Sequence, residues 1–319
     1  MRSNAVAAGQ PAGSNAAGGL LVAELVLLAA VWGLAYLFFR VGVRDFGPVT
    51  VAWLRLCIAT LCLLPGVWWR GEAGHLARHW RPLLVVGTCN FALPFVLYAY
   101  AMQTLSAGLA SILNATAPLF ASLIAWAWLR ERLSLARVMG LAVGFAGVVL
   151  LAWDRLGATP AAASAGPSVA VGFLLCMAAT IAYGYAASYT RRYLSEVPAL
   201  AVAAGSLLAS SMLLTLPAVA QWPATPPPLR AWLPVVALGV LCTGWAFATY
   251  FRLLARIGPS RTIAITYLTP AFGVGWGWLW LHEVVTWPML AACAVILLGT
   301  ALGSGSLRRP RPKAAPSGT

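Results

Sequence analysis

The sequence predicts an all-helical, polytopic membrane protein whose ten transmembrane helices form two inverted five-helix repeats. Three observations lead to this fold class: the apolar composition, a sequence pattern that recurs at a fixed offset, and the alternating placement of arginines. With 61% hydrophobic residues, 9% charged residues and a mean hydropathy of +0.84, the 319-residue chain has too few polar residues to cover a water-soluble domain. We therefore expect it to lie in a lipid bilayer.

Ten apolar runs approach the roughly 20 residues that a helix needs to cross the hydrocarbon of a bilayer. They cover residues 20–39, 48–69, 82–102, 106–129, 135–153, 168–189, 198–220, 231–251, 261–281 and 286–304. The first run is longer than the apolar part of a signal peptide and ends on Arg40 without a small-residue cleavage site. We expect it to remain attached as the first span.

Most of the 21 basic residues fall on one side of the predicted membrane when the N-terminus is placed inside. The opposite side keeps only Arg40, Arg44, Arg155 and Arg230, and Arg55 lies within the second span. Cytoplasmic loops carry an excess of Lys and Arg. The distribution therefore predicts a multi-pass protein of the inner (plasma) membrane with both termini in the cytoplasm.

The stretches 116–133 and 268–285 match at an offset of 152 residues. They share Pro118 with Pro270, Phe120 with Phe272, Trp126 with Trp278, Leu129 with Leu281 and Glu131 with Glu283. The first stretch runs into three arginines, whereas the second runs into a loop without Lys or Arg. Five spans per copy reverse the direction of the second copy, so equivalent loops face opposite sides and differ in basic charge. The repeat is thus predicted to be inverted.

This organisation divides the chain into five segments. We predict a disordered cytoplasmic tail over 1–19, a first repeat over 20–153, a linker rich in Ala, Gly, Pro and Ser over 154–167, a second repeat over 168–304 and a basic cytoplasmic tail over 305–319.

Inverted repeats of membrane helices are typical of secondary transporters, whose substrate site lies at the repeat interface. The segments "VWGLAYLFFR", "AWLRLCIA" and "AGLASILNATAPLFASLIAWAWLRERL" resemble the EamA family of the drug/metabolite transporter superfamily. The resemblance extends from Leu20 to Gly303 and implies a ten-helix inner-membrane carrier, often an exporter of amino acids, metabolites or drugs. It does not name a substrate, a transport direction or an energy source.

Three prolines inside the predicted spans mark candidate hinges. Proline lacks the N–H that would bond the carbonyl four residues earlier, so Pro94, Pro118 and Pro270 free the carbonyls of Asn90, Asn114 and Thr266. Freed carbonyls at membrane depth need another partner, such as cavity water or a ligand. We therefore predict that Asn90, Asn114 and Thr266 bind substrate near the midplane. The alternative is that the asparagines bond neighbouring helices.

Aromatic side chains with a polar edge form a second candidate set. Trp32, Tyr98, Tyr183 and Trp245 lie within the spans, and such rings suit a cavity for amphipathic or cationic solutes. The alternative is the aromatic belt at the membrane interfaces, which explains the tryptophans at the ends of the apolar runs.

Two charged residues, Glu24 and Arg55, lie within apolar runs and away from the arginines that mark the cytoplasmic run ends. Glu24 is the acidic residue placed to carry a coupling proton, although the helix dipole also favours a glutamate near a helix start. Arg55 either reaches the interface with its long side chain or has an internal partner. Glu131 and Glu283 are interpreted as structural, pairing with arginines or capping helices.

Further patterns limit the function classes. The three histidines form no metal set and no G-x-S-x-G motif is present, so we expect no enzyme, metal or cofactor. Small groups of arginines between apolar runs do not indicate nucleic-acid binding. The expected partners are a small-molecule substrate and membrane lipid. Gly140, Gly144, Gly299 and Gly303 have a spacing suited to a homodimer face or to packing between the repeats. A channel or a lipid or sugar-phosphate flippase is the alternative function.

Overall fold

A computed structural model describes residues 13–157, 168–262 and 264–303, and every regular element in these residues is helical. The first half contains α1 (Gly13–Phe46), α2 (Pro48–Trp69), α3 (Ala73–Arg78), α4 (Trp80–Gly87), the π-helical η1 (Thr88–Ala92), α5 (Leu93–Ala101), α6 (Ala107–Asn114), α7 (Ala117–Leu129) and α8 (Leu135–Gly157). The second half contains α9 (Val169–Tyr193), α10 (Ala199–Ala220), α11 (Leu229–Gly239), the π-helical η2 (Val240–Trp245), α12 (Ala246–Ile257), α13 (Pro259–Thr262), α14 (Ala264–Leu281) and α15 (Trp287–Gly303).

Eight helical segments of the described residues are long and apolar enough to cross a membrane, from Gly19–Phe46 to Leu229–Ile257. They include the continuous stacks α4–η1–α5, α6–α7 and α11–η2–α12. Two further apolar helices, α14 and the 17-residue α15, complete the bundle. The predicted all-helical membrane protein is therefore confirmed.

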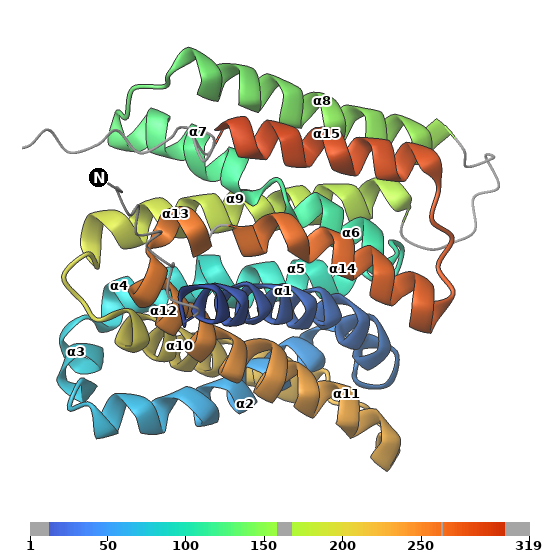
Figure 1. The fold of residues 1–319 in the computed structure, drawn as a ribbon. Helices are drawn as coiled ribbons and strands as arrows, with labels where there is room; N and C mark the ends of the chain where they lie inside the picture. The colour runs from blue at the N-terminus through green and yellow to red at the C-terminus, as the bar shows by residue number, and fades with distance from the viewer. Residues whose placement is uncertain (1–12, 158–167, 263, 304–319) are drawn as a thin grey trace, which may run out of the picture.

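The long helices run side by side along one direction (Figure 1). At one edge α8 packs against α15, in the middle α1 packs against α14, and at the opposite edge α2 packs against α10 and α11. α9 contacts both α5 and α7, so helices of the two halves alternate through the bundle. This interdigitation leaves a space between the halves that neither half encloses alone.

The α8–α15 contact is built on glycines. A Cβ added to Gly299 would overlap the backbone of Gly144, and a Cβ added to Gly140 would overlap the backbone of Gly303 and Gly299. Small residues let membrane helices approach closely. These four glycines thus serve packing between the two halves of the chain.

Two helices extend past the predicted segment boundaries. α1 begins at Gly13, so residues 13–19 of the predicted disordered tail belong to this helix. α8 extends to Gly157, beyond the predicted start of the linker. Residues 1–12, 158–167 and 304–319, which include the rest of the predicted linker and tails, lie outside the described part of the chain.

The predicted fourth span is not one continuous helix. It breaks at Ala115 and Thr116, whose N–H groups bond to carbonyls only three residues earlier, at 3.0 and 3.1 Å. Pro118 has no N–H to bond the Asn114 carbonyl. The next carbonyl, that of Ala115, accepts a hydrogen bond of 3.1 Å from the Thr300 hydroxyl of α15. Pro118 therefore lies in the first turn of α7 and not inside a helix.

Candidate functional site

A cavity of about 980 Å³ lies between the two halves, with walls from α1, α2, α4, η1, α5 and α6 of the first half and α9, α10, α12 and α14 of the second. The structure brings together all the predicted substrate-binding residues except Trp245. Its lining includes Trp32, Asn90, Tyr98, Asn114, Tyr183 and Thr266, with Pro270 beside them. Residues far apart in sequence thus meet in one space of the size that suits a small organic molecule.

Three predicted residues, two candidate hinges and one candidate substrate-binding residue, lie outside the cavity lining. Pro94 and Pro118 do not line the cavity, and Pro94 lies at the start of α5 directly after the π-helical η1. Trp245 packs against the apolar core that α1 and α2 share. It ends η2, and the wider turn of a π-helix shifts the face on which a side chain lies.

Ten aromatic side chains contribute to the cavity wall around the polar groups. The Tyr98 hydroxyl donates a 3.0 Å hydrogen bond to Asn114 Oδ1, which ties α5 to α6. The Tyr98 ring lies edge-on to Tyr36, with centroids 6.1 Å apart, and stacks 6.4 Å from Tyr183. Trp32 of α1 packs against Tyr250 of α12, with ring centroids 5.3 Å apart. The site therefore offers ring faces with a few hydroxyl and amide groups between them.

One cation, Arg55 of α2, is buried beside this wall, with only 7% of its surface exposed. Its Nε donates a 2.8 Å hydrogen bond to the Thr243 hydroxyl, and that hydroxyl donates to the Leu238 carbonyl at 2.9 Å. The guanidinium carbon lies 3.8 Å from the Phe95 ring centroid and 4.9 Å from that of Phe39. Arg55 thus has internal partners, and its side chain does not extend to the membrane interface.

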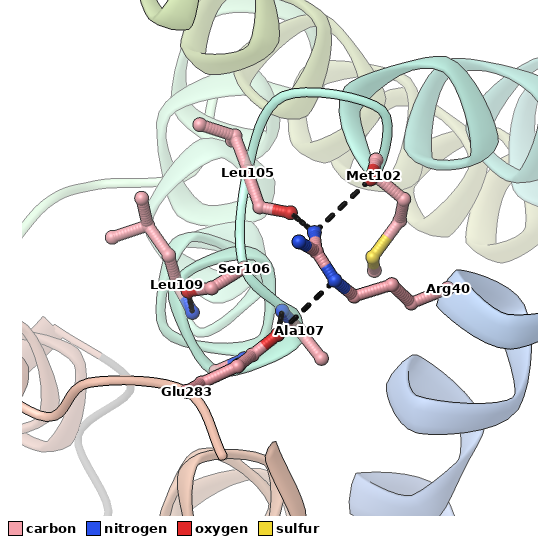
Figure 2. A network of polar contacts seen from close by, with 8 residues as sticks. Arg40, Met102, Leu105, Ser106, Ala107, Leu109 and Glu283 are labelled. Carbon is pink, nitrogen blue, oxygen red and sulfur yellow. Dashed lines mark hydrogen bonds and ion pairs between the residues drawn. The ribbon is translucent and has the colours of Figure 1, made fainter. Parts of the chain in front are cut away.

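Glu283 takes part in a network of polar contacts with Arg40 at one end of the bundle, here named the Arg40 end (Figure 2). Its carboxylate accepts hydrogen bonds from the backbone N–H of Ala107 at 2.8 Å and of Gly108 at 3.1 Å. Arg40 Nε lies 3.3 Å from Glu283 Oε1, and Arg40 Nη1 donates to the carbonyls of Met102 and Leu105. The pair therefore binds together α1, the start of α6, the α5–α6 turn and the segment after α14.

A second pair of the same kind lies at the other end, named the Arg191 end. Arg191 of α9 pairs with Glu131, which also lies 3.8 Å from Arg137. Both glutamates follow a helix that ends in a residue of left-handed conformation, Arg130 (φ 56°) after α7 and His282 (φ 52°) after α14. Such a residue reverses the chain direction at a helix end.

The two ends differ in how they bound the cavity. Thr190, Arg191, Leu194 and Ser195 line it at the Arg191 end, whereas no residue of the Arg40–Glu283 network does. The Arg191–Glu131 pair is also more exposed, with side chains 60% and 30% accessible against 25% and 10% for Arg40 and Glu283. The cavity is therefore closed toward Arg40 and reaches the surface toward Arg191.

The EamA-like transporter family matches this chain twice, over residues 19–153 and 170–304. The chain belongs to this family. The resemblance drawn from the sequence is thereby confirmed, and the family makes the protein a membrane transporter.

Several relatives resemble this EamA transporter over most of its length. The uncharacterized transporter YvbV of Bacillus subtilis (strain 168) is 26% identical over 290 residues, which cover 89% of this chain and 90% of YvbV. A probable terminal-alkyne amino-acid exporter of Streptantibioticus cattleyicolor is 28% identical over 88% of this chain and 89% of the exporter. The uncharacterized inner membrane transporter YedA of Escherichia coli (strain K12) is 26% identical over 80% of each chain. These names indicate a transporter rather than an enzyme.

A solved crystal structure shares the fold of this EamA transporter. The two align with a TM-score of 0.62 over 89% of this chain and 96% of the other, at 24% sequence identity. The likeness supports the helical arrangement alone.

The remaining predicted residue of the EamA transporter, Glu24, lies outside the cavity lining. Its carboxylate is 4.0 Å from Arg252 and 3.9 Å from Arg256, so it joins α1 to α12. Proton coupling through Glu24 stays a prediction.

Some lining residues of this EamA transporter were not selected from the sequence. Phe91 and Phe95 line the cavity, and Ser111 does so beside Pro270. The spacing Phe91–Phe95 was the available signal, because residues four apart share a helix face. That signal does not reveal whether the face meets lipid or a cavity.

Proposed function

We propose that this transporter is a secondary carrier that moves a small molecule by alternating access, with the cavity as its binding site. The observation that carries the proposal is the asymmetry of the two ends: one closed by the Arg40–Glu283 network, the other open beside Arg191. A carrier exposes one site to each side in turn, and a site closed on one side and open on the other suits one such state.

We further propose that the chain crosses the membrane ten times as two inverted repeats. Equivalent positions of the two copies make equivalent contacts, which supports this assignment. A Cβ on Gly33 of α1 would lie 2.6 Å from the Phe272 Cβ of α14, and one on Gly184 of α9 would lie 2.8 Å from the Phe120 carbonyl carbon of α7. The two Arg–Glu pairs are related in the same way, Glu131 to Glu283 and Arg40 to Arg191.

The proposed orientation places the Arg191 end in the cytoplasm, following the excess of arginines in the loops of that side. The cavity then faces inward, the state in which an exporter takes up its substrate. A small amphipathic metabolite, an amino acid or a drug suits the aromatic wall, and the relative named as a probable amino-acid exporter agrees with export. A channel would be open along one continuous polar pore, and a flippase would need a lateral opening to lipid.

Proteoliposomes loaded with a metabolite panel test the carrier. We expect saturable counterflow of one solute class, reduced about tenfold or more in Asn114→Leu and Trp32→Ala, because each removes a side chain that lines the cavity. Trp287→Ala is the matched control, since Trp287 is 83% exposed. Non-saturable flux would favour the channel, and unchanged counterflow in both variants would remove the site assignment.

An imposed pH gradient in the same vesicles tests whether Glu24 couples transport to protons. Gradient-driven uptake that persists in Glu24→Gln rules out its coupling role.

A further inference from the structure

The cavity holds a cation whose charge no carboxylate of the described residues balances. Among the residues that the structure describes, Arg55 forms no ion pair and no Asp or Glu lines the cavity. The acidic side chains that form ion pairs in the described structure, Glu24, Glu131 and Glu283, are bound to other arginines. A buried charge without a counter-ion is unfavourable, and within a membrane protein it commonly marks a functional site.

The environment of Arg55 holds the guanidinium in place without neutralising it. The Thr243 hydroxyl takes one of its five N–H groups, and the rings of Phe95 and Phe39 face its plane. The other four N–H groups find no acceptor among the described residues. Two of them on adjacent nitrogens match the geometry of a carboxylate, which binds arginine through two parallel hydrogen bonds.

Of the two cations among the described lining residues, Arg55 is the one that has no carboxylate partner and can pair with a substrate. The second lining cation among the described residues, Arg191, lies at the open end and is already paired with Glu131. Away from the Arg191 end, the described lining of the cavity therefore carries a single positive charge, that of Arg55, among aromatic side chains. One such charge balances a monocarboxylate, whereas a phosphate ester carries about two negative charges and would want further cations.

On the basis of the proposed carrier function, we propose that Arg55 is the anion-binding residue of the site and that the substrate is a small monocarboxylate with an apolar or aromatic body. The carboxylate pairs with the free Nη1–Nη2 edge of the guanidinium, and the body lies against Tyr36, Tyr183 and Trp32. Pairing cancels the buried charge. The substrate-loaded carrier then presents a neutral cavity to the membrane interior.

Ligand binding to the purified full-length protein tests this assignment apart from transport. Intrinsic tryptophan fluorescence follows titration with four probes that share a phenyl group: 3-phenylpropanoate, phenylalanine, 3-phenylpropylamine and phenyl phosphate. Hexanoate tests an alkyl body. We expect the carboxylate probes to bind, and Arg55→Met to weaken their binding by roughly 10- to 100-fold, the range for hydrogen bonds to a charged group. Arg55→Lys should recover part of the affinity, because it restores the charge without the planar fork.

Thermal unfolding separates a binding role from a structural one. Removing an unpaired buried charge should leave the melting temperature of the ligand-free Arg55→Met protein unchanged or higher, while the stabilisation by 3-phenylpropanoate disappears. Arg44→Met is the matched control, since Arg44 is exposed at the end of α1 and lies outside the cavity lining. A lower melting temperature with carboxylate stabilisation intact would overturn the proposal and make Arg55 structural.

Other outcomes are equally decisive. Preferred binding of the amine or the phosphate ester, or no binding of any carboxylate, would overturn the substrate class. Phenylalanine binding that Arg55→Met removes would support it, because the zwitterion shares the carboxylate. Counterflow with the same probes separates this inference from the carrier: Arg55-dependent binding without transport removes the carrier, whereas transport unaffected by Arg55→Met removes only the anion site.

Discussion

The Glu283 carboxylate accepts two backbone hydrogen bonds at the start of α6 and pairs with Arg40 at the same time. The first N–H groups of a helix have no partner within the helix, so a carboxylate there satisfies them and interacts favourably with the helix dipole. Only 10% of its side chain is exposed, which limits solvent screening. This single residue therefore links three segments at the closed end.

Replacing Glu283 should open that end more often. Glu283→Gln removes the charge and weakens both the ion pair and the capping bonds, so we expect an increase of about tenfold in the open population. The measurement is the labelling rate of Ser111→Cys, in a chain without its native cysteines, by a membrane-impermeant thiol reagent added outside intact cells. Ser111 lines the cavity and is fully buried.

A matched control for this experiment is Glu196→Gln, which neutralises an exposed glutamate at the Arg191 end. It should leave the labelling rate unchanged. Equal rates in Glu283→Gln and the parent chain would show that the Arg40–Glu283 network does not hold this end closed.

At the scale of elements, the α8–α15 contact depends on the absence of side chains. Gly299→Leu places carbon atoms where the Gly144 backbone lies, and backbone atoms cannot move aside as a flexible side chain can. We expect a loss of about 1–3 kcal/mol in stability, typical of overpacking, seen as a lower melting temperature of the purified protein. Gly275→Leu is the control, because a Cβ at Gly275 meets no atom within 4 Å. Equal melting temperatures would contradict this account of the contact.

The sequence accounts only in part for the helical irregularities, which are the break between α6 and α7 and the π-helical segments η1 and η2. Pro118 indicates a disturbed fourth span, whereas the hydrogen bond that the Thr300 hydroxyl of α15 donates to the Ala115 carbonyl at the break depends on tertiary packing. The π-helical η1 and η2 occupy positions related by the 152-residue offset, although proline follows only η1. In η2 the Thr243 hydroxyl bonds the Leu238 carbonyl five residues earlier. Such local geometry follows from packing as well as from composition.

At the scale of the whole molecule, the inverted repeat requires equivalent loops on opposite sides of the membrane. Reporter fusions after residues 133 and 285 test this arrangement. We expect the first fusion to fluoresce with a cytoplasmic fluorescent protein and the second to be active with alkaline phosphatase, which functions outside. The physical reason is the three arginines that follow α7 and the lack of Lys and Arg after α14. The same reporter result at both positions would exclude inversion.

The sequence by itself determined that the chain is a helical membrane protein of the EamA family, because hydropathy and repeated motifs are local properties that survive without coordinates. It also selected six of the polar and aromatic lining residues, three of them because proline frees carbonyls at defined positions. The break in the α6–α7 span, the position of Trp245 outside the cavity and the partner of Glu24 required the tertiary structure, since each depends on which helix lies opposite. So did the environment of Arg55. Its sequence position shows a charge inside a span, and only the packing of α2 against η2 and α5 shows that the charge is buried, oriented and without a carboxylate among the described residues.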